Sequence, residues 1–309
     1  MTSFDVSVGI SPRQSFDSWA AFVTGLEAEG VRRVWVIDSQ LAMKDVYAGL
    51  VVAALNTTRI GLGTGVTNAV TRHPTVTANA IAAVAEISHG RAILGLGAGD
   101  SALYGIGLKP QKVAEMEEAI GFFRSTVDKS IPIHLAVSQQ RMCELAGRLA
   151  DGAIVMGPAQ ADLVKQQVEW IEVGLRSAGR DRGEVEIAVM ATVAPEPEDV
   201  RSWASTQARL LSHYKELPES LVPFRDEIAR SAETYDYAEH LSTHASHGAA
   251  VSDDLVRTLA IVGTPGECAS RLRTLQATGI EALIFPLAGR ARLEKWRRIR
   301  DEILAQIIV

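Results

Sequence analysis

The chain has 309 residues, a mass of 33.2 kDa and a formal net charge of −6 at pH 7. Hydrophobic residues make up 47% of it and charged residues 22%, a balance typical of a folded globular protein that excludes a disordered, collagen-like or coiled-coil chain. Because the chain has no basic surplus to neutralise phosphates, its composition also argues against a nucleic-acid partner.

No segment predicts a membrane span. The longest apolar stretches, 46–55 and 78–87, have about ten residues where a bilayer needs about twenty. The N-terminal residues lack the basic start and the apolar block of a secretory signal, so we expect a cytoplasmic protein. Cys143 and Cys268 lack metal-ligand spacing and are expected to be reduced thiols, and no metal site is predicted.

Short β-branched runs alternate with amphipathic helical patterns from the N-terminus onward. The first four runs are residues 4–10, 33–37, 60–66 and 91–96. The helical patterns that follow them cover residues 17–29, 45–56, 74–88 and 112–127, and Gly30 ends the first of these helices. Each unit has about thirty residues, the length that a parallel β/α unit needs.

The same alternation continues towards the C-terminus. Strands are predicted at 131–136, 152–156, 185–193 and 282–285, and helices at 139–149, 161–178 and 293–307. Eight strands that alternate with helices in a chain of this length favour a (β/α)8 TIM barrel over a doubly wound sheet. We therefore predict an α/β fold with one barrel domain over residues 1–309.

Residues 194–279 interrupt this rhythm as an insertion between the seventh and eighth strands. Helical patterns are expected in it near 199–216, 218–235, 254–261 and 267–277. In a barrel, an insertion after strand seven lies on the catalytic face, where it can form a lid over the ligand. An oligomer contact or plain packing is an equally good interpretation.

Chemistry in a barrel is expected at the carboxyl ends of the strands. Asp38 follows the second strand and Asp100 the fourth, which predicts two carboxylates at the mouth, although Asp is also a favoured helix N-cap. Glycines recur at strands three and four, at positions 61, 63, 65, 95, 97 and 99. Because glycine weakens a strand, these positions indicate close approach of a flat ligand or its phosphate, or else strands that bend in a crowded barrel.

Other functional motifs have little support. Asp100 stands where a Rossmann fingerprint needs glycine or alanine, and neither a P-loop nor a nucleophile elbow occurs. His240, His244 and His247 are spaced to share one helix face, which zinc could use. The small residues between them offer no groups to fix such ligands, so a solvated or lid-facing helix is the better interpretation.

Four stretches in the first third of the chain together form a recognisable pattern. They are 36–40 (VIDSQ), 58–68 (TRIGLGTGVTN), 71–74 (TRHP) and 88–100 (SHGRAILGLGAGD). With these stretches the chain resembles the bacterial luciferase-like oxidoreductases, especially the branch that includes methylenetetrahydromethanopterin reductase. The resemblance is strong over residues 34–107 and architectural beyond them, although 263–265 and 278–280 are also similar to the family.

The resemblance implies a (β/α)8 barrel that holds FMN or the deazaflavin F420 in its mouth, F420 being slightly favoured. A non-proline cis peptide is implied near Gly65–Val66. The cofactor-binding residues that it implies are Thr64, Gly65, Val66, Thr67, Asn68, Gly97, Ala98, Gly99, Asp100, Ser138, Met156, Gly157 and Pro158. The phosphate end is expected at 97–99, 138 and 157–158, where backbone N–H groups and hydroxyls can bind an anion.

One departure from the family concerns the catalytic residues. Many F420-dependent members carry Asp-His-Phe or Asp-His-Tyr after strand two, where this chain has Asp38, Ser39 and Gln40. A catalytic imidazole therefore cannot be carried over. Because a flavin supplies the difficult chemistry itself, Asp38 and Gln40 are the predicted catalytic residues.

The sequence thus predicts a flavin-type oxidoreductase that transfers hydride between F420 and a small organic substrate. One alternative is a two-component monooxygenase that uses FMNH2 from a separate flavin reductase, and another is a non-catalytic flavin-binding protein. The resemblance also implies a homodimer with contacts through the helices after strands two and three. The substrate stays open, because the insertion has no recognisable signature.

Overall fold

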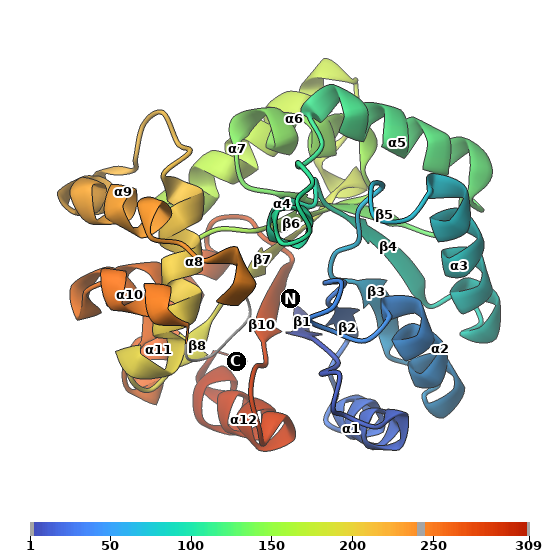
Figure 1. The fold of residues 1–309 in the computed structure, drawn as a ribbon, viewed down its shortest axis with the longest axis horizontal. Coiled ribbons are helices and arrows are strands. Elements are labelled where there is room, and N and C mark those ends of the chain that lie inside the picture. Colours follow the sequence, from blue (N-terminus) through green and yellow to red (C-terminus); the bar gives the residue numbers. More distant parts are fainter. Residues whose placement is uncertain (1–2, 240–244, 308–309) are drawn as a thin grey trace.

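A closed barrel of parallel strands lies at the centre of the computed structural model, which describes residues 3–239 and 245–307 (Figure 1). Its eight strands are β1 (Ser3–Val8), β2 (Arg33–Val36), β3 (Gly61–Thr64), β4 (Ala92–Leu96), β5 (Ile133–Val137), β6 (Gly152–Val155), β7 (Glu186–Met190) and β10 (Ala282–Pro286). They pair in chain order, and β1 closes the ring against β10 with Phe4 opposite Leu283. The predicted (β/α)8 TIM barrel is confirmed.

Helices surround the barrel as an outer ring (Figure 1). They are α1 (Phe16–Ala28), α2 (Val46–Asn56), α3 (Pro74–Ile87), α5 (Val113–Thr126), α6 (Gln140–Leu149), α7 (Ala161–Ser177), α11 (Pro265–Gln276) and α12 (Arg292–Arg298). A short helix that the sequence did not predict, α4 (Asp100–Tyr104), follows β4 directly. Its first residue comes after Gly99, whose φ of +89° favours glycine.

Capping side chains set where several of these helices begin. Ser15 accepts a hydrogen bond from Ser18 N at 3.1 Å before α1, and Asp45 accepts one from Ala48 N at 2.9 Å in α2. Before α11, the Glu267 carboxylate accepts a hydrogen bond from the backbone N–H of the N-cap residue at 2.8 Å, which is half of a capping box. These local signals explain why the helical patterns were readable from the sequence.

Two apolar layers build the core. One lies between the sheet and the helices and contains Trp19, Leu50 and Phe123. The other fills the inside of the barrel and consists of Trp35, Ile93, Ile154, Ala188, Met190, Ala282 and Ile284. Because side chains occupy the barrel interior, a ligand can lie only above this layer, at the carboxyl ends of the strands.

The segment between β7 and β10 forms a separate group of elements on one side of the ring (Figure 1). They are β8 (Val193–Ala194), η2 (Pro197–Val200), α8 (Arg201–Leu211), η3 (Glu219–Phe224), α9 (Arg225–Glu233), η4 (Tyr237–Glu239), η5 (Ser246–Ala250), α10 (Asp253–Leu259) and β9 (Ile261–Val262). β8 and β9 pair in parallel, and α8 and α10 share a small core of their own. Helix α11 contacts α7 and the C-terminal turns, so it belongs to the barrel ring although the predicted insertion, 194–279, includes it.

Two predicted helices are broken in the structure. The helix expected at 218–235 is the 3-10 segment η3 followed by α9, because Pro223 lacks the backbone N–H that a continuous helix needs. The helix expected at 293–307 is α12, then a π segment η6 (Ile299–Ile303) and a 3-10 turn η7 (Leu304–Gln306). Both stretches remain helical in outline, so the order of elements is unaffected.

Within the described residues, no helix has the length and apolar character to cross a membrane. Cys143 and Cys268 are buried free thiols, as predicted, and burial raises the pKa of each. Neither thiol is therefore activated as a nucleophile.

Candidate active site

The carboxyl ends of all eight strands meet at one rim of the barrel, because the strands are parallel. Asp38 lies at this rim just after β2 and is 5% exposed. Its Oδ2 accepts hydrogen bonds from Thr67 Oγ1 at 2.7 Å and from Arg72 Nη1 at 2.5 Å. Its Oδ1 accepts one from Gln40 Nε2 at 3.2 Å. Asp38 is therefore a fixed, buried carboxylate at the mouth and not the helix N-cap that was the alternative interpretation.

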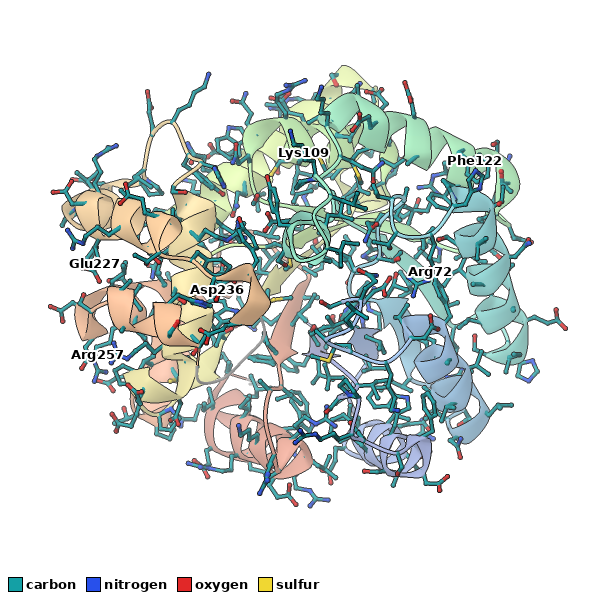
Figure 2. All side chains as sticks on the ribbon, viewed as in Figure 1. Arg72, Lys109, Phe122, Glu227, Asp236 and Arg257 are labelled. Carbon is teal, nitrogen blue, oxygen red and sulfur yellow. The ribbon has the colours of Figure 1, made fainter. Side chains whose placement is uncertain are left out.

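Arg72 is the residue of this cluster that sequence reasoning missed (Figure 2). It bridges Asp38 and Asp45, donating to Asp45 Oδ2 at 2.8 Å, and its guanidinium lies 5.3 Å from the Tyr47 ring. Burial lowers the pKa of Arg72, but the two carboxylates raise it, and the net effect is a rise. Burial, together with the Asp38 charge, raises the pKa of Tyr47 to about 12. The only hint in the sequence is that Arg72 stands in the TRHP stretch, well after the strand end.

Gln40 connects the loops after β2 and β3. Its Nε2 also lies 3.2 Å from Thr71 Oγ1, while its Oε1 is buried without a hydrogen-bond partner among the described residues. Leu41 follows at φ +67° with 89% of its surface exposed. Buried amide oxygens are normally satisfied, so Gln40 Oε1 is a position where a bound molecule would supply the missing donor.

The segment after β3 contains the cis peptide Gly65–Val66, as the resemblance implied. The Thr64 hydroxyl exchanges hydrogen bonds with the Gly95 backbone at 2.7 and 2.9 Å. The Asn68 side chain accepts hydrogen bonds from the backbone N–H groups of residues 70 and 71 at 3.0 and 2.8 Å. The backbone N–H groups of residues 65 and 67 also donate to carbonyls in β2 and β4, at 2.7 and 2.9 Å. Together with the Thr67 bond to Asp38, these contacts use most side-chain groups and part of the backbone groups of 64–68.

The glycines of β3 and β4 are explained by protein neighbours. A Cβ at Gly63 would lie 2.4 Å from the Trp35 ring, and one at Gly65 would lie 2.7 Å from Trp35 Cβ. A Cβ at Gly95 would lie 2.0 Å from a backbone oxygen, and one at Gly97 would lie 2.7 Å from Val66 Cγ2. These contacts support the crowded-barrel interpretation, since side chains and backbone already fill the space that the glycines leave.

Asp100 follows β4, and Arg209 of α8 reaches it from the insertion. Arg209 Nη1 donates to Asp100 Oδ1 at 3.2 Å, and Nη2 forms a second, shorter contact with Oδ2. Burial lowers the pKa of Arg209, but Asp100 raises it, and the net effect is a rise. The predicted cofactor-binding carboxylate is thus already paired with a buried cation that sequence reasoning missed.

The ends of β5 and β6 carry the remaining predicted residues. The Ser138 carbonyl accepts hydrogen bonds from Gln167 Nε2 at 2.8 Å and from the Tyr214 hydroxyl. Met156 packs against the apolar layer inside the barrel. Gly157, which precedes Pro158, has open surroundings, because a Cβ there would meet nothing closer than 3.5 Å. This side of the mouth therefore offers backbone groups and the Ser138 hydroxyl, which makes no hydrogen bond to another described residue.

Of the three histidines predicted to share one helix face, His240 and His244 lie outside the described residues. His247 lies in η5 and is 4% exposed, with its ring 4.2 Å from that of Tyr235. Burial lowers the pKa of His247. No group of three or more potential metal ligands occurs in the part of the chain that the structure describes.

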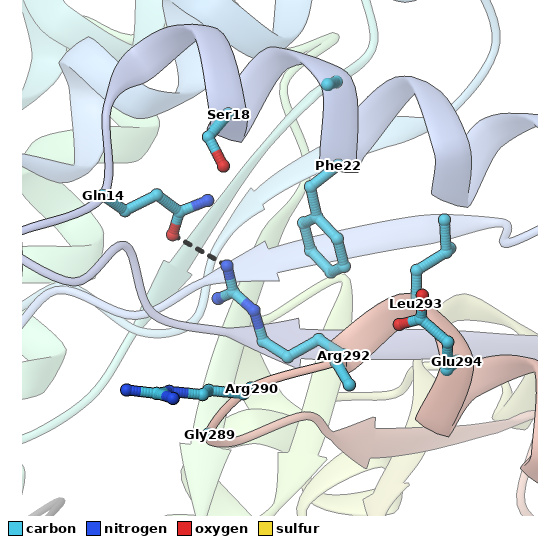
Figure 3. Close-up of a pocket in the computed structure, with 10 residues that line it drawn as sticks. Gln14, Ser18, Phe22, Gly289, Arg290, Arg292, Leu293 and Glu294 are labelled. Atoms are coloured by element: carbon cyan, nitrogen blue, oxygen red, sulfur yellow. Dashed lines mark hydrogen bonds between the residues drawn. The ribbon is translucent and has the colours of Figure 1, made fainter.

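A surface groove with a volume of about 450 Å³ lies between α1 and the loop after β10 (Figure 3). Arg292 crosses it, donating to Gln14 Oε1 at 2.7 Å and to the Gly9 carbonyl at 2.8 Å, with its guanidinium 4.5 Å from the Phe22 ring. The groove contains none of the predicted site residues. Arg292 is engaged in joining α1 to the C-terminal part of the chain. We therefore place the candidate site at the mouth of the barrel.

Comparison with known proteins assigns the family. The sequence model of the family described as luciferase-like monooxygenase matches residues 1–130 and 110–282. The chain belongs to this family. The predicted identification as a luciferase-like oxidoreductase, and therefore as an enzyme, is confirmed.

Individual relatives agree with this assignment. The chain is 29% identical over 283 residues to a 5,10-methylenetetrahydromethanopterin reductase of Methanolobus tindarius, covering 84% of this chain and 86% of the relative. The solved coenzyme F420-dependent tetrahydromethanopterin reductase of Methanopyrus kandleri superposes with a TM-score of 0.77 at 20% identity over 99% of both chains. An F420-dependent secondary alcohol dehydrogenase in complex with an F420–acetone adduct superposes with a TM-score of 0.73 at 17% identity over 98% of both chains. At these identities the two structures show the shared fold.

Proposed function

We propose that this protein is an oxidoreductase that transfers hydride between the deazaflavin F420 and a small organic substrate. The observation that carries the proposal is the buried Asp38 carboxylate, held by Arg72 and Thr67 at the mouth of a luciferase-like barrel. The relatives that match over most of their length are reductases of a reduced pterin, and a structural neighbour is named for F420. Methylenetetrahydromethanopterin is therefore the first substrate to assay.

The residues at the mouth fit a flavin-type ring. Of the seven buried side-chain oxygens without a hydrogen-bond partner among the described residues, three belong to residues after strand ends or beside them: Gln40 Oε1 after β2, Thr192 Oγ1 after β7 and Gln167 Oε1 beside Ser138. Such a ring presents both donors and acceptors along its edges, and unsatisfied buried groups are rare in folded proteins. The ring of strand ends thus offers polar partners on several sides of an apolar floor.

F420 would supply the hydride chemistry itself at C5 of its ring. The part of the protein is to orient the reactants and to exclude water. Asp38 Oδ2 is fully engaged, so only Oδ1 and the Gln40 amide are available to touch the ring or the substrate. We assign both residues to the positioning of the reacting centre, where loss of alignment costs rate more than affinity.

The phosphate end of the cofactor is assigned to the opposite part of the rim. The residues proposed there are Gly97, Ala98, Gly99, Ser138, Gly157 and Pro158, with Asp100 at the edge of this stretch. The remaining predicted contacts are Thr64, Gly65, Val66, Thr67 and Asn68 beside the ring, and Met156. The Ser138 hydroxyl, which has no hydrogen-bond partner in the described part of the chain, and the open surroundings of Gly157 support this assignment. Backbone N–H groups in such glycine-rich loops are suited to bind an anion.

The experiment that tests the cofactor is an anaerobic titration of the intrinsic Trp fluorescence with F420 and, separately, with reduced FMN. The proposal expects saturable F420 binding followed by substrate reduction without oxygen. A preference for reduced FMN together with oxygen-dependent turnover would favour the two-component monooxygenase instead, an alternative supported by the description of the family. Binding without turnover in either assay would favour the non-catalytic flavin-binding protein.

Asp38→Asn tests the catalytic assignment. Because Asn keeps the size of the side chain and removes its charge, we expect kcat to fall by about 10² to 10³ with little change in stability. Asp45→Asn is the matched control, since Asp45 is the other carboxylate paired with Arg72 and is 52% exposed. Equal losses in the two variants would show that Asp38 acts only through Arg72.

We also propose a homodimer that buries the outer faces of α2 and α3. Four large apolar side chains are exposed on these two β/α units: Leu41, Leu55, Val70 and Val76. Leu55 lies on α2 and Val76 on α3, and such exposed apolar side chains are suited to burial in a protein interface. Sedimentation of the wild type and of Leu55→Lys tests this assignment, the variant being expected to be monomeric. The cytoplasmic location stays a prediction that cell fractionation would test.

A further inference from the structure

The insertion is attached to the barrel at the strand ends that we assign to the phosphate of the cofactor. Arg209 of α8 pairs with Asp100 after β4, and the Tyr214 hydroxyl donates to the Ser138 carbonyl after β5. The Arg209–Asp100 ion pair is the only one that joins the insertion to the barrel within residues 3–239 and 245–307. This attachment brings a side chain of the insertion next to a loop that has to accept an anion.

Asp100 poses an electrostatic problem in that loop. It lies one residue after Gly99, within the stretch proposed to contact a phosphate, and its side chain is 39% exposed. A carboxylate beside an anionic phosphate group raises the free energy of the complex, because like charges at short range repel each other. The loop can hold a phosphate only if the charge of Asp100 is compensated.

Arg209 has the geometry to compensate that charge. It contacts both carboxylate oxygens of Asp100, and its own side chain is only 2% exposed. The guanidinium lies 4.9 Å from the Tyr235 ring and 5.4 Å from the Tyr237 ring, and Nη1 is 3.3 Å from the Tyr237 hydroxyl. Two rings, a hydroxyl and a carboxylate therefore hold the cation in one place.

One donor of Arg209 is left over. Its Nε is buried and has no hydrogen-bond partner among the described residues. The contacts of Arg209 with the described residues therefore do not use the whole guanidinium group.

We propose that Arg209 is a positioning residue for the phosphate end of the cofactor: it neutralises Asp100 and so makes the loop after β4 able to accept an anion. The inference rests on the proposed function. It assigns the insertion a role in cofactor binding, in addition to the lid over the substrate that the sequence predicted. A cofactor without a phosphate would not need this charge compensation.

The test compares affinities for F420 and for its phosphate-free core, measured by quenching of Trp fluorescence. Arg209→Met is expected to weaken F420 binding by about tenfold or more and to change binding of the phosphate-free core by less than about twofold. Arg209→Lys keeps the charge and is expected to retain most of the F420 affinity. The double variant Arg209→Met with Asp100→Asn is expected to regain it, since the uncompensated carboxylate is then absent.

Arg230→Met is the matched control, because Arg230 is an exposed arginine of α9 in the same insertion. It is expected to bind both ligands as the wild type does. Equal weakening of F420 and of its core by Arg209→Met, or no recovery in the double variant, would overturn the proposal in favour of a purely structural role. If Arg209→Met fails to fold, the double variant decides the question: F420 affinity close to that of the wild type supports charge compensation, and equal weakening of F420 and of its core contradicts it. If the wild type binds neither ligand, the proposed function itself fails.

Discussion

Two buried titratable groups at the amino ends of the strands give opposite contributions to the pH dependence of stability. Asp5 of β1 is fully buried, and its Oδ2 accepts hydrogen bonds from Arg33 Nε at 3.0 Å and Trp35 Nε1 at 3.1 Å. Burial, only partly offset by Arg33, raises the pKa of Asp5 to about 6. His134 of β5 is 3% exposed, its ring lies 5.3 Å from that of Trp35, and burial lowers the pKa of His134 to about 3.

The sign for each group follows from proton binding in the folded and unfolded chain. Between about pH 4 and 6 the folded state holds a proton on Asp5 that the unfolded chain has lost, so this contribution to the free energy of unfolding falls as pH rises. In the same pH window His134 is protonated in the unfolded chain and neutral in the folded state. The contribution of His134 to the free energy of unfolding therefore rises with pH. Each slope is about 1.4 kcal/mol per pH unit, and in the wild type the two cancel.

Urea unfolding followed by Trp fluorescence between about pH 4 and 6 separates the two groups. Relative to the wild type, Asp5→Asn is expected to gain about 2 to 3 kcal/mol of unfolding free energy from the lower to the upper pH. His134→Leu is expected to show a change of similar size and opposite sign. All other titrating groups cancel in these differences. Curves for both variants that run parallel to the wild type would refute the assignment of buried, shifted groups at this end of the barrel.

Three further predictions concern stability. They are checked by urea unfolding midpoints, with each variant and the wild type compared at the same pH. Arg91→Met is expected to cost about 2 to 4 kcal/mol, because the guanidinium donates to the Ala54 and Thr57 carbonyls at the C-terminal end of α2 and to the Ile60 carbonyl before β3, at 2.8 to 3.1 Å. Burial raises the pKa of Glu27, but three backbone N–H donors lower it, and the net effect is a fall. The contribution of Glu27 to the free energy of unfolding is therefore present above about pH 4 and is lost on acidification. Glu27→Gln should therefore cost about 1 to 2 kcal/mol at neutral pH and progressively less towards pH 3. Gly63→Ala should cost about 1 to 3 kcal/mol, because the new Cβ meets the Trp35 ring. Gly121→Ala in α5, where a Cβ meets open space, should instead gain about 0.5 to 1 kcal/mol. Equal effects of the two substitutions would contradict the packing argument.

Local sequence signals were sufficient to predict the order of strands and helices. Buried parallel strands are short apolar runs, and helices such as α2 and α11 begin at capping residues that the sequence displays. The exceptions have specific causes. Pro223 divides a predicted helix, and the ring helix α11 was included in the insertion because a helical pattern does not show which surface it packs against.

The candidate site was predictable only where chemistry coincides with a strand end. Asp38 and Gln40 follow β2 directly, so the barrel rule placed them at the mouth. Arg72 and Arg209, which pair with the two carboxylates of the rim, stand 34 and 109 residues away from their partners. Ion pairs of this kind have no period or spacing in the sequence, so only the fold reveals them.

The glycines of β3 show how the inside of the barrel supports the mouth. Trp35 donates to Asp5 at the amino end of the strands and fills the space beside Gly63 and Gly65 at the other end. A side chain at Gly63 would push the Trp35 ring aside, and one at Gly65 would meet Trp35 Cβ and backbone. Either change would move β3, and with it the residues after β3 that contact Asp38. The small residues are therefore required by a tryptophan beneath the site, and the backbone above it stays available for a ligand. The same glycines thus serve barrel packing directly and the proposed cofactor site indirectly, so the sequence pattern is compatible with both interpretations.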